Sequence, residues 1–449
     1  MRSSRAFFLA VLLTFTASAA SAATYYVDDS GSNSNPGTLA SPFRTITYGL
    51  TFLTNPGDTL WVRGGTYNER AVIWNKHGNS TSPIYVGGYN GELPVIDGTG
   101  IGNHSTVSIN TSSYVTFDGF KVQNAPQTAI LMWNAHNITV KYCTVENAMK
   151  AGIHAGGDTV NAAHDIVIRN NTVTNTVREN VPGSNLTSGW SQAVSCIKAT
   201  NVIIRDNWVR RNYGEGIDCI LSDYCTIEKN TVYDNKGSNI YLDNAQHSIV
   251  DRNYIYNTGN SEYFRDGMPS PGITVANETY SIQNPSTNLT ITNNIVHRTG
   301  VGFVYYNSQY GGGMHYTLIA NNTFYKTVNT ATGMIYIEDG STTNVHDTTT
   351  IENNIFYQST GVRYARAPTV GITWRTNNWY NGTSNTHVAG TGDVMADPLL
   401  VAAGGWSATD YKLSSTSTLK TAGTTNAATT DHWGTARTAS YSIGAHEYD

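Results

Sequence analysis

Apolar and polar residues alternate in short runs along most of the chain, and the runs repeat in a fixed order. Between residues 201 and 253 each unit holds an alternating apolar strand, an Asn, a second short strand, a polar corner and a third strand that opens with Gly-Ile or Asn-Ile. Such a repeat of roughly twenty residues, without a helical period, is typical of a coil of short strands whose turns bury their apolar edges against their neighbours. The pattern predicts an all-β fold, a single-stranded right-handed parallel β-helix.

The second strands of successive turns begin at equivalent positions. These positions are Cys143, Asn171, Asn207, Asn230, Asn253, Asn294, Asn322 and Asn354, with Asn378 as a weaker last member. Asn tolerates a left-handed backbone at a sharp corner, and stacked side-chain amides can form hydrogen bonds from turn to turn. We therefore expect these residues to form an internal asparagine ladder.

The third strands also align, and they predict columns of side chains on the outside of the coil. In triplets such as Gly216-Ile217-Asp218 the Ile points into the core, so the next residue points out. The expected column consists of His154, Lys198, Asp218, Tyr241 and Thr274. A second column, two positions further along each strand, is expected to consist of Thr200, Ile220, Asp243 and Ala276.

Two turns, 171–207 and 253–294, are longer than the basic repeat, and the surplus in each lies just before a third strand. Both insertions are therefore expected to leave the coil at the same corner, on either side of the turns that carry Asp218 and Tyr241. Insertions on one face of a solenoid usually line its binding surface. They would bring towards the column Arg178, Glu179, Trp190, Gln192, Glu262, Tyr263, Arg265 and Asp266.

The first 22 residues resemble a secretory signal peptide. Arg2 and Arg5 precede a short apolar run, and Ala20-Ser21-Ala22 offers a cleavage site with small residues. We expect residues 23–449 to form one soluble, monomeric domain that is secreted to the periplasm or outside the cell and has no membrane partner. Within it, 23–112 would be the N-terminal cap and opening turns, 113–380 the regular coils and 381–449 a C-terminal tail.

Composition narrows the partners of the protein. The net charge is only −5 and no basic run occurs, which argues against nucleic acid. Scarce charges together with abundant Asn, Thr, Ser, Gly and Tyr suit polar, aromatic surfaces that handle sugars. The four cysteines, Cys143, Cys196, Cys219 and Cys225, lack metal-ligand spacing; they are expected to be buried small hydrophobes or, alternatively, to form a disulfide.

The segment after the signal peptide carries a resemblance to a known family. The residues concerned are Asn35-Pro36-Gly37-Thr38, Ser41-Pro42-Phe43, Gly57-Asp58-Thr59 and Arg63-Gly64-Gly65-Thr66-Tyr67. They look like the opening turn of secreted pectate-lyase-like β-helix proteins. The resemblance implies a short amphipathic helix over the open end of the coil, which Thr45 to Leu53 would supply. It does not fix the activity, because the superfamily includes lyases, hydrolases, epimerases and non-catalytic adhesins.

A lyase that cleaves an acidic, uronate-containing polysaccharide by β-elimination is the first functional prediction. Such a reaction needs a base for the C5 proton, neutralisation of the carboxylate and an acid for the leaving oxygen. Lys198 is a candidate base, and Tyr241 or His154 could share the base and acid roles. Arg265 could neutralise the carboxylate, and Glu262, Trp190, Gln192 and Arg178 are further candidates for substrate binding.

A calcium ion is a possible cofactor of this lyase, and no organic cofactor is expected. Asp218, Asp243 and Glu215 offer hard oxygen ligands that could hold Ca²⁺ against the substrate. Calcium-dependent pectate lyases of this superfamily present several Asp followed by Lys or Arg on a later turn. Here Lys198 comes before the acids and Tyr241 follows Asp218 by one turn, so the chain departs from that pattern.

Two alternatives remain open. An inverting glycoside hydrolase needs two carboxyl groups about 6.5–9.5 Å apart. Asp218 and Asp243, on adjacent turns and neighbouring columns, could meet that distance, with Glu215 or Glu262 in reserve. Lys198 and Arg265 would then be hydrogen-bond donors to the substrate. The second alternative is a non-catalytic glycan-binding or surface β-helix protein.

Overall fold

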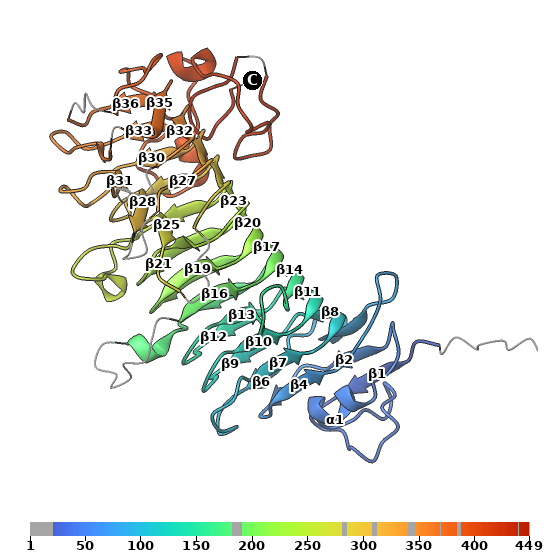
Figure 1. Cartoon of the computed structure of the whole chain (residues 1–449). Helices are drawn as coiled ribbons and strands as arrows, with labels where there is room; N and C mark the ends of the chain where they lie inside the picture. The colour runs from blue at the N-terminus through green and yellow to red at the C-terminus, as the bar shows by residue number, and fades with distance from the viewer. Residues whose placement is uncertain are drawn as a thin grey trace, which may run out of the picture.

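The computed structural model describes residues 21–181, 191–280, 285–307, 312–339, 346–368, 370–383, 388–438 and 440–448. Within these residues the chain winds as a right-handed coil of short parallel strands, stacked turn upon turn from the N-terminal end to the C-terminal end (Figure 1). Three parallel sheets run along the coil, and each regular turn gives one strand to each sheet. This architecture confirms the predicted parallel β-helix.

Sheet 1 has thirteen strands: β1 (Thr24–Val27), β2 (Thr59–Val62), β5 (Ile84–Gly88), β8 (Ser113–Asp118), β11 (His136–Lys141), β14 (His164–Arg169), β17 (Thr200–Arg205), β20 (Asp223–Glu228), β23 (Ile249–Asp251), β26 (Thr290–Thr292), β29 (Leu318–Ala320), β32 (Thr349–Glu352) and β35 (Ile372–Arg375). Sheet 2 has twelve: β3 (Thr66–Tyr67), β6 (Val95–Asp97), β9 (Lys121–Gln123), β12 (Thr144–Glu146), β15 (Thr172–Thr174), β18 (Trp208–Asn212), β21 (Thr231–Asn235), β24 (Tyr254–Tyr256), β27 (Ile295–His297), β30 (Thr323–Tyr325), β33 (Ile355–Tyr357) and β36 (Asn378–Tyr380).

Sheet 3 has eleven strands: β4 (Ala71–Trp74), β7 (Val107–Asn110), β10 (Ile130–Trp133), β13 (Ile153–Gly156), β16 (Gln192–Ile197), β19 (Glu215–Ile220), β22 (Ile240–Asp243), β25 (Ile273–Asn277), β28 (Phe303–Asn307), β31 (Ile335–Ile337) and β34 (Ala365–Arg366). The described helices are short: α1 (Ile46–Thr51), η1 (Tyr89–Gly91), η2 (Arg178–Asn180), η3 (Ser261–Tyr263), η5 (Ala408–Tyr411) and η6 (Thr418–Thr421). None of the helices in this described part is long and apolar enough to cross a membrane.

Helix α1 covers the N-terminal end of the coil, as the resemblance implied. The Thr45 hydroxyl caps the helix by accepting a hydrogen bond from the backbone N–H of Tyr48. Ile46 and Leu50 are buried on its inner face and join the core that runs through the coil. The helix therefore closes an apolar core that would otherwise be open to water.

The asparagine ladder forms as predicted up to its last position. The backbone N–H of Cys143 donates to the Oδ1 of Asn171, and the same bond continues turn by turn to Asn354. The last member is Asn377, whose Oδ1 accepts from the Asn354 backbone, so the prediction of Asn378 was wrong by one residue. Positive φ falls on the residue before each ladder position, for example 56° at Asp206, and not on the Asn itself.

The tail from residue 397 onwards packs on the outer face of sheet 2. Tyr411 is buried there against Tyr325 and Ile295. Arg437, also buried, pairs with Glu447 at 2.9 Å and so fixes the last residues of the described chain. The tail thus covers aromatic side chains that would otherwise face solvent.

Candidate functional site

The register of sheet 3 places most of the predicted column in one line. His154 lies opposite Ser195, Ser195 opposite Asp218, Asp218 opposite Tyr241, and Tyr241 opposite Thr274. Four of the five predicted members therefore lie in one column, in which Ser195 separates His154 from Asp218. Ser195 takes the place that the sequence analysis gave to Lys198.

Lys198 is not part of the column. The register pairs Cys196 with Cys219, so the triplet equivalent to 216–218 is 193–195 and not 196–198. Lys198 falls after the end of β16, where its φ of 53° turns the chain towards sheet 1. Matching Gly-Ile-Asp to Cys-Ile-Lys shifted the alignment by three residues.

The second column is also confirmed except for its first member. Ile220 lies opposite Asp243, and Asp243 opposite Ala276. Thr200 belongs to β17 in sheet 1 and lies opposite Asp223, so its placement was wrong. Asp218 and Asp243 are therefore on adjacent turns and neighbouring columns, as the sequence analysis expected.

The acidic members of the columns face outward but are covered by neighbouring side chains. Asp218 is 1% exposed and Asp243 is 3% exposed. Burial, reinforced by the nearby Glu215 and Asp243 carboxyls, raises the pKa of Asp218 well above its usual range. Burial also raises the pKa of Asp243 to about 8, although a hydrogen bond from Tyr280 acts in the opposite direction.

A hollow of about 480 Å³ lies over these strands. It is lined by Glu215, Ser238, Tyr241, Arg265, Pro271, Thr274, Glu278, Val304, Tyr306 and Tyr336. The lining residues of β19, β22, β25, β28 and β31 form its floor. Arg265 and Pro271 come from the insertion between β24 and β25, which connects sheet 2 to sheet 3. The other insertion lies between β15 and β16, at the same corner of the coil and three turns earlier, as predicted.

Two carboxyl groups line the hollow itself. Burial raises the pKa of Glu215 to about 7, and the charge of Glu278 acts in the same direction. The Tyr241 hydroxyl donates to the Glu278 carboxylate at 2.5 Å. The hollow therefore contains one carboxyl group that holds its proton near neutral pH and a second that accepts a hydrogen bond.

Two carboxylate oxygens beside the hollow have no hydrogen-bond partner among the described residues. They are the Oδ1 atoms of Asp218 and Asp243. Buried polar atoms are nearly always hydrogen-bonded, and the exceptions often mark functional positions. Together with the raised pKa values of Glu215, Asp218 and Asp243, these atoms distinguish the acidic cluster, which is Glu215, Asp218, Asp243 and Glu278, from ordinary solvated surface.

Sequence reasoning missed Glu278, Tyr280, Tyr336 and Ser195. Glu278 and Tyr280 follow β25, in a connection whose length has no counterpart in the shorter turns. The polar run Asn277 to Tyr280 directly after a third strand was the available signal. Ser195 could have been found by pairing the two inward cysteines, Cys196 and Cys219, on neighbouring turns.

The other predicted residues lie at or beyond the edge of this site. Gln192 is buried opposite Glu215, whereas Arg178 is exposed on η2. Glu262 accepts a hydrogen bond from Tyr213, and neither Glu262 nor Arg178 lines the hollow. Trp190 lies outside the described residues.

His154 lies two turns before Asp218, at the N-terminal edge of the acidic cluster. Its Nδ1 is 2.8 Å from the Ser195 hydroxyl, and its ring stacks on Trp133. Burial lowers the pKa of His154 to about 4, so the ring is neutral near pH 7. His154 is therefore placed as a packed neighbour of the column, outside the hollow.

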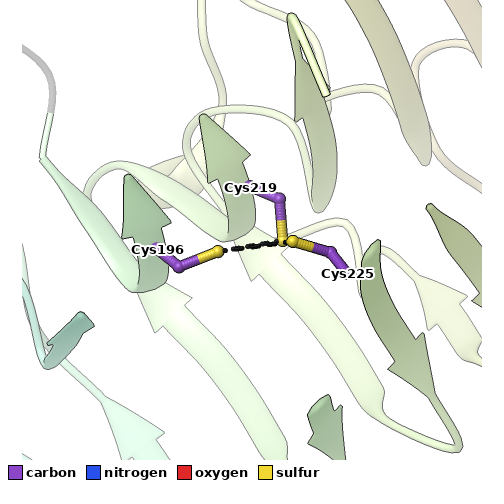
Figure 2. A group of neighbouring side chains, drawn as sticks. All are labelled: Cys196, Cys219 and Cys225. Carbon is purple, nitrogen blue, oxygen red and sulfur yellow. Dashed lines mark hydrogen bonds between the residues drawn. The ribbon is translucent and has the colours of Figure 1, made fainter. Parts of the chain in front are cut away.

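Three of the four cysteines meet in the core beneath the site (Figure 2). The Sγ of Cys196 lies 3.3 Å from that of Cys219 and 3.6 Å from that of Cys225. In the described part of the chain this is the one group of three or more Cys, His, Asp or Glu whose ligand atoms all lie within 4.8 Å of one another. Thiols suit soft metal ions, whereas calcium needs oxygen ligands.

The comparisons with known proteins match this fold. A family model described as a Pel9A-like right-handed β-helix region matches residues 25–248, and a second right-handed β-helix model matches 173–349. No curated protein matches the chain in sequence.

Several solved structures share the architecture. The structure of XylC with xylose aligns at a TM-score of 0.67, with 13% identity over 95% of this chain and 98% of that chain. Pectate lyase Pel9A aligns at 0.51, with 17% identity over 95% and 96% of the two chains. The GH136 lacto-N-biosidase from Eubacterium ramulus aligns at 0.55, with 16% identity over 83% and 67%. The two family models together identify residues 25–349 as right-handed β-helix, with a Pel9A-like region over 25–248.

Proposed function

We propose that this protein is a glycoside hydrolase that cleaves an uncharged glycan in the hollow over sheet 3. The observation that carries the proposal is the pair of carboxyl groups, Glu215 and Glu278, that line the hollow with Asp218 and Asp243 buried beside them. Glycosidic bond hydrolysis needs one carboxyl group that holds a proton near neutral pH and a second that is ionised.

Glu215 has the properties of the general acid. Its pKa of about 7 keeps roughly half of the molecules protonated at neutral pH, ready to protonate the leaving oxygen. Glu278 would be the partner that activates water or attacks the sugar, oriented by the hydroxyl of Tyr241. Burial raises the pKa of both Asp218 and Asp243, which favours their protonated forms behind the pair, and Asp243 accepts a hydrogen bond from the Tyr280 hydroxyl.

The charge of the hollow favours hydrolysis over the uronate lyase that was the first prediction. Arg265 is the one basic side chain among the described residues that line it, and Lys198 lies outside. A uronate carboxylate would meet an acidic cluster with a single cation to balance it. An uncharged sugar avoids that repulsion and can use the exposed ring of Tyr306 as a stacking face.

The test is a screen of the purified protein on neutral and acidic polysaccharides, reading reducing ends and near-ultraviolet absorbance together. New reducing ends without absorbance support the hydrolase. Absorbance from an unsaturated sugar would show a lyase. If neither reducing ends nor absorbance increases, a glycan-binding protein is favoured. The anomer released, followed by proton NMR, would distinguish inversion from retention.

A calcium-dependent lyase is the second candidate. The unpartnered Oδ1 atoms of Asp218 and Asp243 favour it, because hard carboxylate oxygens are calcium ligands. Against it, these two groups and Glu215 do not bring three ligand oxygens within 4.8 Å of one another in the described structure. Loss of activity on chelation and its recovery with added calcium would support this candidate.

A further inference from the structure

Two more hollows lie in a row with the one that contains Glu215 and Glu278, around the corner of the coil. A middle hollow of about 300 Å³ shares Ser238, Arg265 and Pro271 with it. A far hollow of about 390 Å³ shares Pro269 with the middle one. The middle hollow therefore adjoins both of the others, and the row of three runs from the strands of sheet 3 along the insertion 257–272 to the corner that follows the strands of sheet 2.

The far hollow is built from three separate parts of the chain. It is lined by Asn257, Thr258, Gly259, Phe264, Pro269, Arg298, Lys326, Thr327, Val328, Ser359 and Trp406. Residues 257–269 come from the insertion, 298–359 from the turns beneath it, and Trp406 from the tail. The insertion and the tail thus both contribute to this hollow, at the corner that follows the strands of sheet 2.

Trp406 is held in place although it is 54% exposed. The Arg298 guanidinium lies 3.8 Å from the centroid of its ring and donates to the carbonyl of Gly404. The ring edges of Tyr256 and His297 support it from sheet 2. A fixed aromatic ring that remains half exposed can bind a ligand at little entropic cost.

The chemistry of the far hollow suits a sugar. It combines two aromatic rings with the hydrogen-bond donors Arg298 and Lys326 and the hydroxyls of Thr258 and Ser359. None of its described lining residues is an Asp or a Glu, in contrast to the acidic cluster around Glu215. Few polar groups placed around apolar and aromatic surface are typical of small-molecule and saccharide sites.

We propose that the far hollow is a second saccharide-binding position, and that the three hollows bind one oligosaccharide chain running from Glu215 and Glu278 past Pro269 to Trp406. This inference rests on the proposed function for its substrate class, a glycan. It adds that the protein recognises a chain of several sugars and that the distal sugars contact the tail.

The test compares Trp406→Ala with Trp208→Ala in a Glu215→Gln background, which removes cleavage. Trp208 is 49% exposed on β18 and lines none of the three hollows, so its variant is a matched control. Binding is measured first on an array of neutral and acidic oligosaccharides from two to eight units, and then by calorimetry on the series that binds. Trp406→Ala is expected to weaken binding of the longest member about tenfold and to leave the disaccharide unchanged.

Each outcome decides the inference. Equal effects of Trp406→Ala on long and short members, no effect on either, or no oligosaccharide bound at all would overturn it. If Trp406→Ala unfolds the tail, Lys326→Met must show the same dependence on chain length. If Trp406→Ala weakens binding in a length-dependent way but the unmodified protein hydrolyses no glycan, the oligosaccharide site formed by the three hollows is supported and only the proposed hydrolase activity is rejected.

Discussion

The same turns of the coil contain two sets of buried polar side chains, the asparagine ladder and the acidic cluster, and the two sets differ in how fully their polar atoms are hydrogen-bonded. In the asparagine ladder, Asn207, Asn230 and Asn253 use both the oxygen and the nitrogen of their amides in hydrogen bonds. In the acidic cluster, Asp218 and Asp243 each have one oxygen without a hydrogen-bond partner among the described residues, and the pKa of each is raised. The ladder stabilises the coil, whereas the cluster keeps polar atoms available to bind a ligand or take part in a reaction.

The difference follows from the chemistry of the two groups. A neutral amide has a donor and an acceptor, so identical residues on successive turns satisfy one another. Carboxylates are acceptors only, so acids brought together repel and must hold protons instead. Repeating Asn on successive turns therefore stabilises the fold, whereas repeating Asp or Glu would not, because carboxylates repel one another.

The largest expected effect belongs to the cluster. Glu215→Gln removes the proposed general acid while keeping its size, and should lower kcat/KM roughly 100- to 10,000-fold. Glu146→Gln, which breaks the surface ion pair with Lys121, is the control and should leave kcat/KM unchanged. Kinetics on the glycan found in the screen provide the measurement. Activity of Glu215→Gln close to that of the unmodified protein would remove Glu215 from the reaction.

Substitution of a ladder residue should lower the free energy of unfolding. Asn230→Ala removes the acceptor of two bonds from Asn207 and the donor of bonds to Ile204 and Asn253. Because each buried group left unpaired costs about 1–3 kcal/mol, the free energy of unfolding should fall by about 3 kcal/mol or more. Urea unfolding measures it, with the exposed Asn103→Ala as control. Equal stability of the two variants would contradict a stabilising ladder.

The pH dependence of stability should separate the two sets. The folded pKa of Asp243, about 8, lies above the value of about 4 expected for an unfolded chain. Its contribution is therefore fully present below pH 4 and is lost as pH rises through 8, at up to about 1.4 kcal/mol per pH unit. Asp243→Asn should lose this part of the slope, and Asn230→Ala should keep it. Urea unfolding at pH 5, 6 and 7 tests both expectations. If the free energy of unfolding changes with pH equally in Asp243→Asn and the unmodified protein, the pKa of Asp243 is not raised.

The smallest effect is expected from metal removal. A hydrolase that works through Glu215 and Glu278 should keep its activity and its Tm when the protein is dialysed against a chelator. Activity assays and thermal unfolding before and after dialysis provide the measurement. A loss that calcium restores would move Asp218 and Asp243 from proton-holding groups to metal ligands and favour the second candidate function.

The sequence by itself determined the coil, the ladder up to Asn354 and the direction of most side chains in the columns. It could do so because strand periodicity and the repeat impose the same local rule on every turn, so one well-read turn predicts its neighbours. Its errors at Lys198 and Asn378 came where a long insertion or the frayed last turn breaks that repetition.

The tertiary structure alone decided which outward residues became a site. Glu278 and Tyr280 reach the acidic cluster from a connection without periodicity, and Trp406 reaches sheet 2 from the tail. Asp243, which is 3% exposed, accepts a hydrogen bond from Tyr280, and the charge of Glu278 helps to raise its pKa. Burial and the pKa values that follow from it are properties of how segments far apart in the sequence pack together, and no local pattern encodes them.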